Sequence, residues 1–250
     1  MKKTIAIDAT PLLEEQWGGV SWYSFYIINC LINCTARGDL RVVLFYNSFR
    51  PLNEKIAGLL KKWRRVENVF VVGYRMPNKF LNLSMRFLKL PYIDQLITHN
   101  LSLRGGRFRR PTKQPLAVKP KIDLFLVPNL SFLAISSKTP YIAVCHDLSF
   151  EIFPEFFTMR QRLWHRLIKP RKFYARAHRV IAVSENTKQD LIDLYKIDAS
   201  RIGVAYPGID ESAFFPGCEN ETRSVREKYT LPESFILSVG TLEPRKNYET

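Results

Sequence analysis

The chain has 250 residues, of which 46% are hydrophobic and 13% aromatic, and it carries a formal net charge of +15 at pH 7. This composition excludes a disordered chain and provides for one large hydrophobic core or two of modest size. No apolar run reaches the roughly 18 residues that a transmembrane helix needs, and Asp8 interrupts the apolar start that would otherwise resemble a secretory signal. We therefore expect a globular, cytoplasmic protein.

Strand and helix patterns alternate along the chain up to Ala205. Runs of β-branched and aromatic residues predict strands over residues 4–8, 41–46, 69–72, 123–127, 141–145, 180–183 and 202–205. Apolar residues at helical spacing predict one helix that contains Val20 and Leu31 and another that contains Leu163 and Ile168. The alternation is typical of βαβ units, so we predict an α/β fold with a doubly wound, mainly parallel, Rossmann-like sheet.

The end of the chain has a different character. After the last of these strands, residues 216–233 are polar and predict a linker, and the apolar residues 235–239 predict a new strand. We therefore expect an N-terminal domain over 1–215 and the start of a truncated second domain over 234–250. Residues 105–121, which include three prolines, predict a flexible loop inside the first domain.

Positive charge is concentrated in one segment. Residues 50–121 hold seventeen Lys and Arg against three Asp and Glu, a net charge of +14. The cations that we single out are Lys61, Lys62, Arg64, Arg65, Arg107, Arg109 and Arg110. Because Trp, Phe and Leu stand among them, the segment fits an anionic membrane surface, whereas a solvated basic face with buried aromatic residues is the alternative. The segment lacks a recognition motif for nucleic acid. Residues 159–179 are also basic and contain no acid.

Three short motifs stand where parallel strands end. Gly18-Gly19 opens a helix after the first strand, and such a start allows an anion to approach the backbone, although it is also how a flexible turn is built. His146 ends the fifth strand, facing the ligand crevice or serving a purely structural role. Arg245 and Lys246 follow the predicted strand at 235–239 and form either a diphosphate site or a solvated turn.

Four landmarks in this order resemble the glycosyltransferase family 4 enzymes. They are Ile7-Asp-Ala-Thr-Pro11 with Gly18-Gly19, then Cys145-His-Asp-Leu-Ser-Phe150, then Val180-Ile-Ala-Val-Ser-Glu185 leading to Tyr206-Pro-Gly-Ile-Asp210, and finally Gly240-Thr-Leu-Glu-Pro-Arg-Lys-Asn247. The resemblance implies the N-terminal domain of a GT-B fold. The chain departs from the pattern at Pro207, where many members carry asparagine.

The resemblance also implies a reaction. A hexose is transferred from a nucleotide-diphosphate sugar to a glycan or lipid-linked acceptor, with retention of its anomeric configuration. Mannose is the commoner guess for the hexose, and the expected process is cell-surface polysaccharide synthesis. His146 and Asp147 would be catalytic, with His146 stabilising charge on the transferred sugar, and Gly18, Gly19, Arg245 and Lys246 would bind the donor diphosphate. No metal and no cofactor are expected.

The family's second domain carries two glutamates that hold the donor, and this sequence ends before them. We therefore expect the 250-residue piece alone to be inactive. From the basic segment, we expect the protein to be peripheral at the inner face of the cell membrane. The alternative function is a non-catalytic module that binds a membrane or an acceptor.

Overall fold

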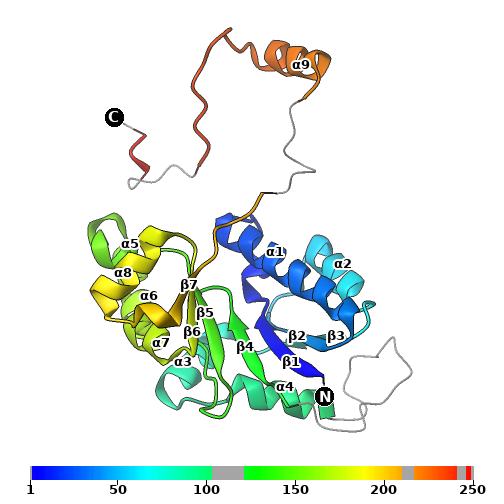
Figure 1. Cartoon of the computed structure of the whole chain (residues 1–250), viewed down its shortest axis with the longest axis vertical. Helices are drawn as coiled ribbons and strands as arrows, with labels where there is room; N and C mark the ends of the chain where they lie inside the picture. The colour runs from blue at the N-terminus through cyan, green and yellow to red at the C-terminus, as the bar shows by residue number, and fades with distance from the viewer. Residues whose placement is uncertain (1, 103–120, 210–216, 241–245, 249–250) are drawn as a thin grey trace.

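Seven parallel strands form one sheet in the computed structural model, which describes residues 2–102, 121–209, 217–240 and 246–248 (Figure 1). The strand order is β3-β2-β1-β4-β5-β6-β7. The strands are β1 (Lys3–Asp8), β2 (Leu40–Asn47), β3 (Val69–Tyr74), β4 (Leu124–Val127), β5 (Tyr141–Cys145), β6 (Arg179–Ala182) and β7 (Ile202–Val204). Every strand predicted up to Ala205 is confirmed, with ends that differ by at most two residues.

Helices connect the strands in chain order. Within the described residues they are α1 (Gly19–Cys34), α2 (Glu54–Trp63), α3 (Asn78–Phe87), α4 (Ile93–Ser102), α5 (Ser149–Ile152), α6 (Met159–Ile168), α7 (Pro170–Arg176), α8 (Glu185–Tyr195) and α9 (Glu219–Tyr229). The two helices predicted from apolar spacing are α1 and α6, and both are confirmed.

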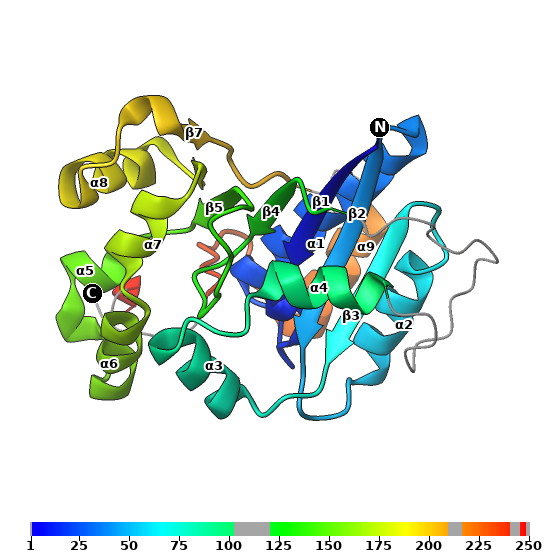
Figure 2. The ribbon, with the colours of Figure 1, turned by 90° about the horizontal axis from the view of Figure 1, so that it is seen from below.

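The sheet separates two hydrophobic cores. Because side chains alternate along a strand, Val42 and Leu44 of β2 face one side of the sheet and Val43 and Phe45 face the other. The first side is covered by α1 and α2, and the second by α3, α4, α7 and α8 (Figures 1 and 2). Helices on both faces of a parallel sheet make this a doubly wound α/β fold, as predicted.

The winding of the sheet reverses between β1 and β4. From β1 the chain proceeds to β2 and β3 on one side, and from β4 it proceeds to β5, β6 and β7 on the other. In doubly wound sheets, ligands bind beyond the carboxyl ends of the strands at this switch point. The carboxyl ends of β1 and β4 therefore locate the candidate site.

The predictions for the end of the chain are only partly met. The predicted linker, residues 216–233, contains helix α9. The strand predicted at 235–239 does not form: Ile236 is 99% exposed and Val239 86% exposed, and no described strand lies beside them to share backbone hydrogen bonds. The division at residue 215 stays a prediction. The predicted loop at 105–121 lies, except for Lys121, outside the described residues.

Candidate active site

Two loops are tied together at the switch point by a buried carboxylate. Asp8 ends β1, and its side chain accepts hydrogen bonds from the Thr10 amide (3.0 Å) and the Ser131 hydroxyl (3.4 Å). Burial raises the pKa of Asp8, and the hydrogen bonds from Thr10 and Ser131 oppose that rise. Since Ser131 lies in the loop after β4, the carboxylate of Asp8 connects the segments that follow β1 and β4.

His146 lies directly after β5, and its side chain reaches the loop after β4. Its Nε2 atom is 2.8 Å from the carbonyl oxygen of Pro128, which follows β4. A carbonyl oxygen only accepts hydrogen bonds, so Nε2 carries the proton that it donates. The ring of Tyr23, on α1, packs nearly perpendicular to the imidazole at 5.1 Å between centroids. The histidine is thus held between the loop after β4 and α1.

The charge state of His146 follows from its burial. Desolvation lowers the pKa of the imidazole, and the hydrogen bond to Pro128 and the charge of Asp147 offset this only in part. The ring is therefore neutral at pH 7, with Nε2 as donor and Nδ1 as acceptor. A neutral imidazole in this tautomer can accept a hydrogen bond from a sugar hydroxyl at Nδ1, but it does not supply a positive charge.

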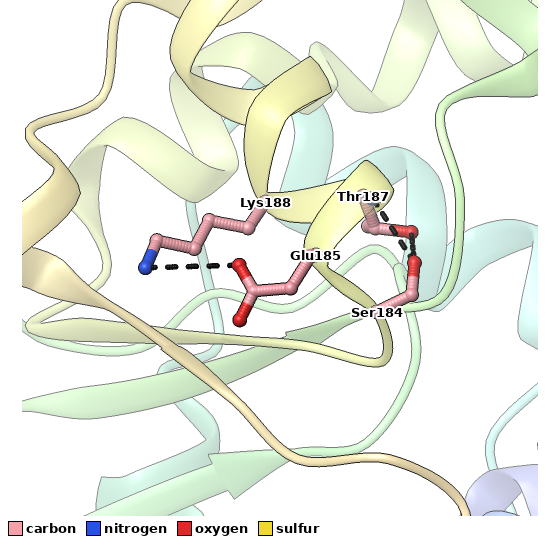
Figure 3. A network of polar contacts seen from close by, with 4 residues as sticks. All are labelled: Ser184, Glu185, Thr187 and Lys188. Atoms are coloured by element: carbon pink, nitrogen blue, oxygen red, sulfur yellow. Dashed lines mark hydrogen bonds and ion pairs between the residues drawn. The ribbon is translucent and has the colours of Figure 1, made fainter.

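Helix α8 begins beside His146. Its first turn is held by the capping residue Ser184 (Figure 3). The hydroxyl of Ser184 accepts a hydrogen bond from the Thr187 amide (3.1 Å) and lies 3.0 Å from the Thr187 hydroxyl. The same Thr187 hydroxyl lies 3.3 Å from the backbone oxygen of His146 and donates to it. Glu185 instead turns to Lys188, at 4.0 Å, on the exposed side of the helix. The start of α8 therefore positions the backbone of His146.

Asp147 is exposed, and it accepts hydrogen bonds from a residue two positions further along the chain. One carboxylate oxygen accepts from the Ser149 amide (3.0 Å) and the Ser149 hydroxyl (2.6 Å), which fixes the start of α5. The carboxylate also acts through its charge: burial lowers the pKa values of both His146 and His165, and the charge of Asp147 opposes part of that lowering. Its geometry accounts for a positioning role, and its catalytic role stays a prediction.

The two glycines open α1 at the same edge of the sheet. Gly18 is the extended residue before the helix, Gly19 is its first residue, and no side chain caps the helix start. An added Cβ would meet no atom within 4 Å at either position, so crowding inside the domain does not require glycine there. Uncapped amides can donate hydrogen bonds to an anionic group, and the ligand-binding interpretation and the flexible turn both remain open.

The structure describes only some of the other predicted site residues. Arg245, Arg107, Arg109 and Arg110 lie outside the described residues. Lys246 is exposed, and no described hydrogen bond or ion pair joins it to the ends of β1 or β5. Lys61 and Lys62 are exposed in the last turn of α2, with Arg65 just beyond, whereas Trp63 between them is only 2% exposed. At α2 the structure therefore matches the alternative interpretation, a solvated basic face with a buried aromatic residue.

The sequence motifs missed the partners of Asp8 and His146. These partners come from three elements: Tyr23 from α1, Pro128 and Ser131 from the loop after β4, and Thr187 from α8. Only the position of Asp8, at the end of a strand, gave a signal. No group of three or more described His, Cys, Asp or Glu side chains has the arrangement of a metal site. None of the described helices is both long enough and apolar enough to span a membrane.

A parallel sheet of seven strands with helices on both faces defines a doubly wound, Rossmann-like α/β protein. The sequence model of one family, described as Glycosyltransferase Family 4, matches residues 17–213. The chain belongs to this family.

Comparisons with individual proteins agree with the family. The chain is 29% identical over 113 residues to the serotype-specific mannosyltransferase WbdA of Escherichia coli, which covers 43% of this chain and 13% of WbdA. It is 36% identical over 72 residues to the D-inositol 3-phosphate glycosyltransferase of Mycolicibacterium smegmatis, 28% of this chain and 16% of that protein. A crystal structure of a glycosyltransferase from Rickettsia africae has the same fold, with a TM-score of 0.51 and 16% identity over 93% of this chain and 50% of that chain.

The chain thus spans less than a fifth of these curated relatives and half of the solved structure.

Proposed function

We propose that this chain is the acceptor-side domain of a retaining glycosyltransferase. The enzyme moves a hexosyl group from a nucleotide-diphosphate sugar to a glycan or lipid-linked acceptor in cell-surface polysaccharide synthesis. The observation that supports the proposal is that Asp8, His146 and the Gly18-Gly19 helix start all lie at or after the carboxyl ends of parallel strands, in a chain of Glycosyltransferase Family 4. Mannose is our choice of sugar, supported by the similarity to WbdA, a mannosyltransferase.

The proposed roles follow from the chemistry of each group. The uncapped start of α1 interacts with the donor diphosphate, and Arg245 and Lys246 add the positive charge that stabilises the departing nucleoside diphosphate. No metal is then needed for that step. The neutral imidazole of His146 accepts a hydrogen bond from a hydroxyl of the transferred sugar and orients its reacting carbon. His146 has no nucleophilic role in this mechanism.

We also propose that the protein acts at the inner face of the cell membrane as a peripheral protein. A lipid-linked acceptor would be presented there, and the net charge of +14 in residues 50–121 would draw the domain to anionic lipid.

A transfer assay tests the proposal. The enzyme as the cell makes it is incubated with a membrane fraction and either GDP-mannose or a UDP-hexose, and the anomeric configuration of the product is read by NMR. We expect transfer of one hexose with the donor's configuration retained. Inversion would contradict the proposed mechanism. Binding to acceptor or membrane without turnover of any donor would favour a non-catalytic module.

A further inference from the structure

Helix α3 carries large apolar side chains on its exposed side as well as on its buried side. Leu81 and Met85 pack into the core, while Phe80 is 74% exposed, Leu83 57% and Phe87 63%. Just beyond the helix, Leu88 is 69% exposed and Leu90 52%. Large apolar side chains grouped on one surface of a soluble domain usually mark a site of interaction.

These side chains border a groove rather than a flat surface. The groove has a volume of about 670 Å³ and is lined mainly by carbon atoms of Met76, Phe80, Leu83, Phe87, Leu88 and Pro91. An occupant of this groove must be largely apolar, because the lining offers almost no hydrogen-bonding groups.

A second surface of the same kind lies beside α3. Helices α3 and α6 are neighbours in both Figure 1 and Figure 2. On α6, Met159 is 77% exposed, Leu163 56% and Trp164 38%. The turn that leads into α6 exposes Phe153 and Phe156. We call the exposed residues of α3, residues 88–90, the turn 152–156 and α6 the α3–α6 surface.

The charge of the α3–α6 surface restricts its partner. Neither α3 nor α6 contains an acidic residue. Cations stand among the apolar side chains: Lys79, Arg86, Lys89, Arg160, Arg162 and Arg166. Two acids lie in the segment before α6. Glu151, on α5, accepts a hydrogen bond from Tyr195, and Glu155 lies in the turn 152–156. A partner must therefore be apolar inside and negatively charged at its surface, which describes an anionic bilayer.

We infer that the α3–α6 surface docks on an anionic phospholipid bilayer, with Phe80, Phe87 and Leu163 entering the interface between head groups and acyl chains. The basic end of α2 is not the docking surface, because Trp63 is buried there and α2 packs on the opposite face of the sheet. A planar bilayer against α3 and α6 leaves α2 facing water. The inference deepens the membrane attachment in the proposed function and rests on it, but it does not need transferase activity.

Vesicle binding by the full chain tests the inference. The probe is a vesicle of phosphatidylcholine with roughly 30 mol% phosphatidylglycerol, compared with pure phosphatidylcholine at low salt. We expect binding only to the anionic vesicles. Trp164 should enter a less polar environment, with a blue-shifted emission that brominated lipid quenches, and Trp164→Phe should remove most of that signal.

Matched variants locate the contact. Lys79→Gln, Lys89→Gln and Arg160→Gln together should weaken binding about 100-fold, from about fivefold per cation. The same change at Lys61, Lys62 and Arg65 of α2 should have less than about a fivefold effect. Phe80→Ser, Phe87→Ser and Leu163→Ser together should weaken binding more than about tenfold. The exposed control set Phe49→Ser, Leu194→Ser and Ile209→Ser should not.

Three results would overturn the inference. The first is equal binding to neutral vesicles, and the second is a larger loss of vesicle binding from the α2 variants than from the α3–α6 variants. The third is a native chain that binds no vesicles but sediments as a dimer, which the Phe80, Phe87 and Leu163 changes dissociate. Vesicle binding at the α3–α6 surface by an enzyme that turns over no nucleotide sugar would support the inference and contradict only the proposed reaction.

Discussion

Acidification should destabilise the domain through His146. Burial holds the pKa of this imidazole below its ordinary value of 6.5 in the folded chain. Between the two pKa values the unfolded chain binds more protons than the folded chain, so the free energy of unfolding rises with pH in that window. The stabilisation is fully present above about pH 6.5 and is lost as the pH falls toward the folded pKa. One proton gives a slope of at most about 1.4 kcal/mol per pH unit.

Two substitutions separate the proton from the hydrogen bond. His146→Gln retains an amide N–H that can donate to the Pro128 carbonyl, but it does not titrate, so stability at neutral pH should change by less than about 1 kcal/mol. His146→Ala leaves that carbonyl without its donor and should cost about 1–3 kcal/mol. His178→Gln, at an exposed position, controls for the replacement of a histidine itself.

Urea unfolding followed by far-UV circular dichroism, from about pH 5 to about pH 8, measures the free energy of unfolding for each chain. The native chain should lose stability on the acid side, and His146→Gln should lose less. Part of the slope should remain, because burial also lowers the pKa of His165. If His146→Gln and the native chain have the same dependence on pH, the buried, neutral state of His146 is wrong.

Three further changes test other parts of the structure. Asp94→Ala should lower the free energy of unfolding in urea by about 2–4 kcal/mol. The reason is that Asp94 accepts hydrogen bonds from the Ser136 amide (3.0 Å), the Ser136 hydroxyl (2.5 Å) and the Thr139 hydroxyl (2.8 Å). A loss under about 1 kcal/mol would contradict that network. Gly19→Ala should leave the melting temperature unchanged or slightly higher, since an added methyl meets no atom within 4 Å. The same change should weaken the binding of a nucleotide sugar measured by calorimetry. A large loss of stability would show that the glycine is structural. Iodoacetamide at neutral pH should modify the exposed Cys30 and Cys218 well before Cys145, because burial raises the pKa of the Cys145 thiol to about 12. Early modification of Cys145, detected by mass spectrometry, would contradict its burial.

The sheet could be predicted because its strands are buried on both faces. A parallel strand such as β2 has Val42 and Leu44 in one core and Val43 and Phe45 in the other, so its sequence is an unbroken apolar run. The segment 235–239 has a similar run but forms no strand, since no described strand lies beside it. An apolar pattern thus identifies residues able to form a strand, whereas pairing decides whether they do.

The site was only partly predictable because its contacts are long-range. The positions of Asp8 and His146 at strand ends were visible in the sequence. Their partners were not, because the contacts of Asp8 with Ser131 and of His146 with Pro128 depend on β1, β4 and β5 being neighbours. Composition also failed to separate α2 from α3: both mix cations with aromatic residues, but Trp63 is buried and Phe80 and Phe87 are exposed.

The central claim is that the edge at β1 and β4 is the sugar-nucleotide site of a glycosyltransferase. The most direct measurement is the release of nucleoside diphosphate from the donor by the enzyme as the cell makes it, compared between the native chain and His146→Ala at equal folded concentration. We expect turnover in the native enzyme and a loss of about 100-fold or more in His146→Ala. Turnover that is unchanged by the substitution, or no turnover of any nucleotide sugar by the native enzyme, would contradict it.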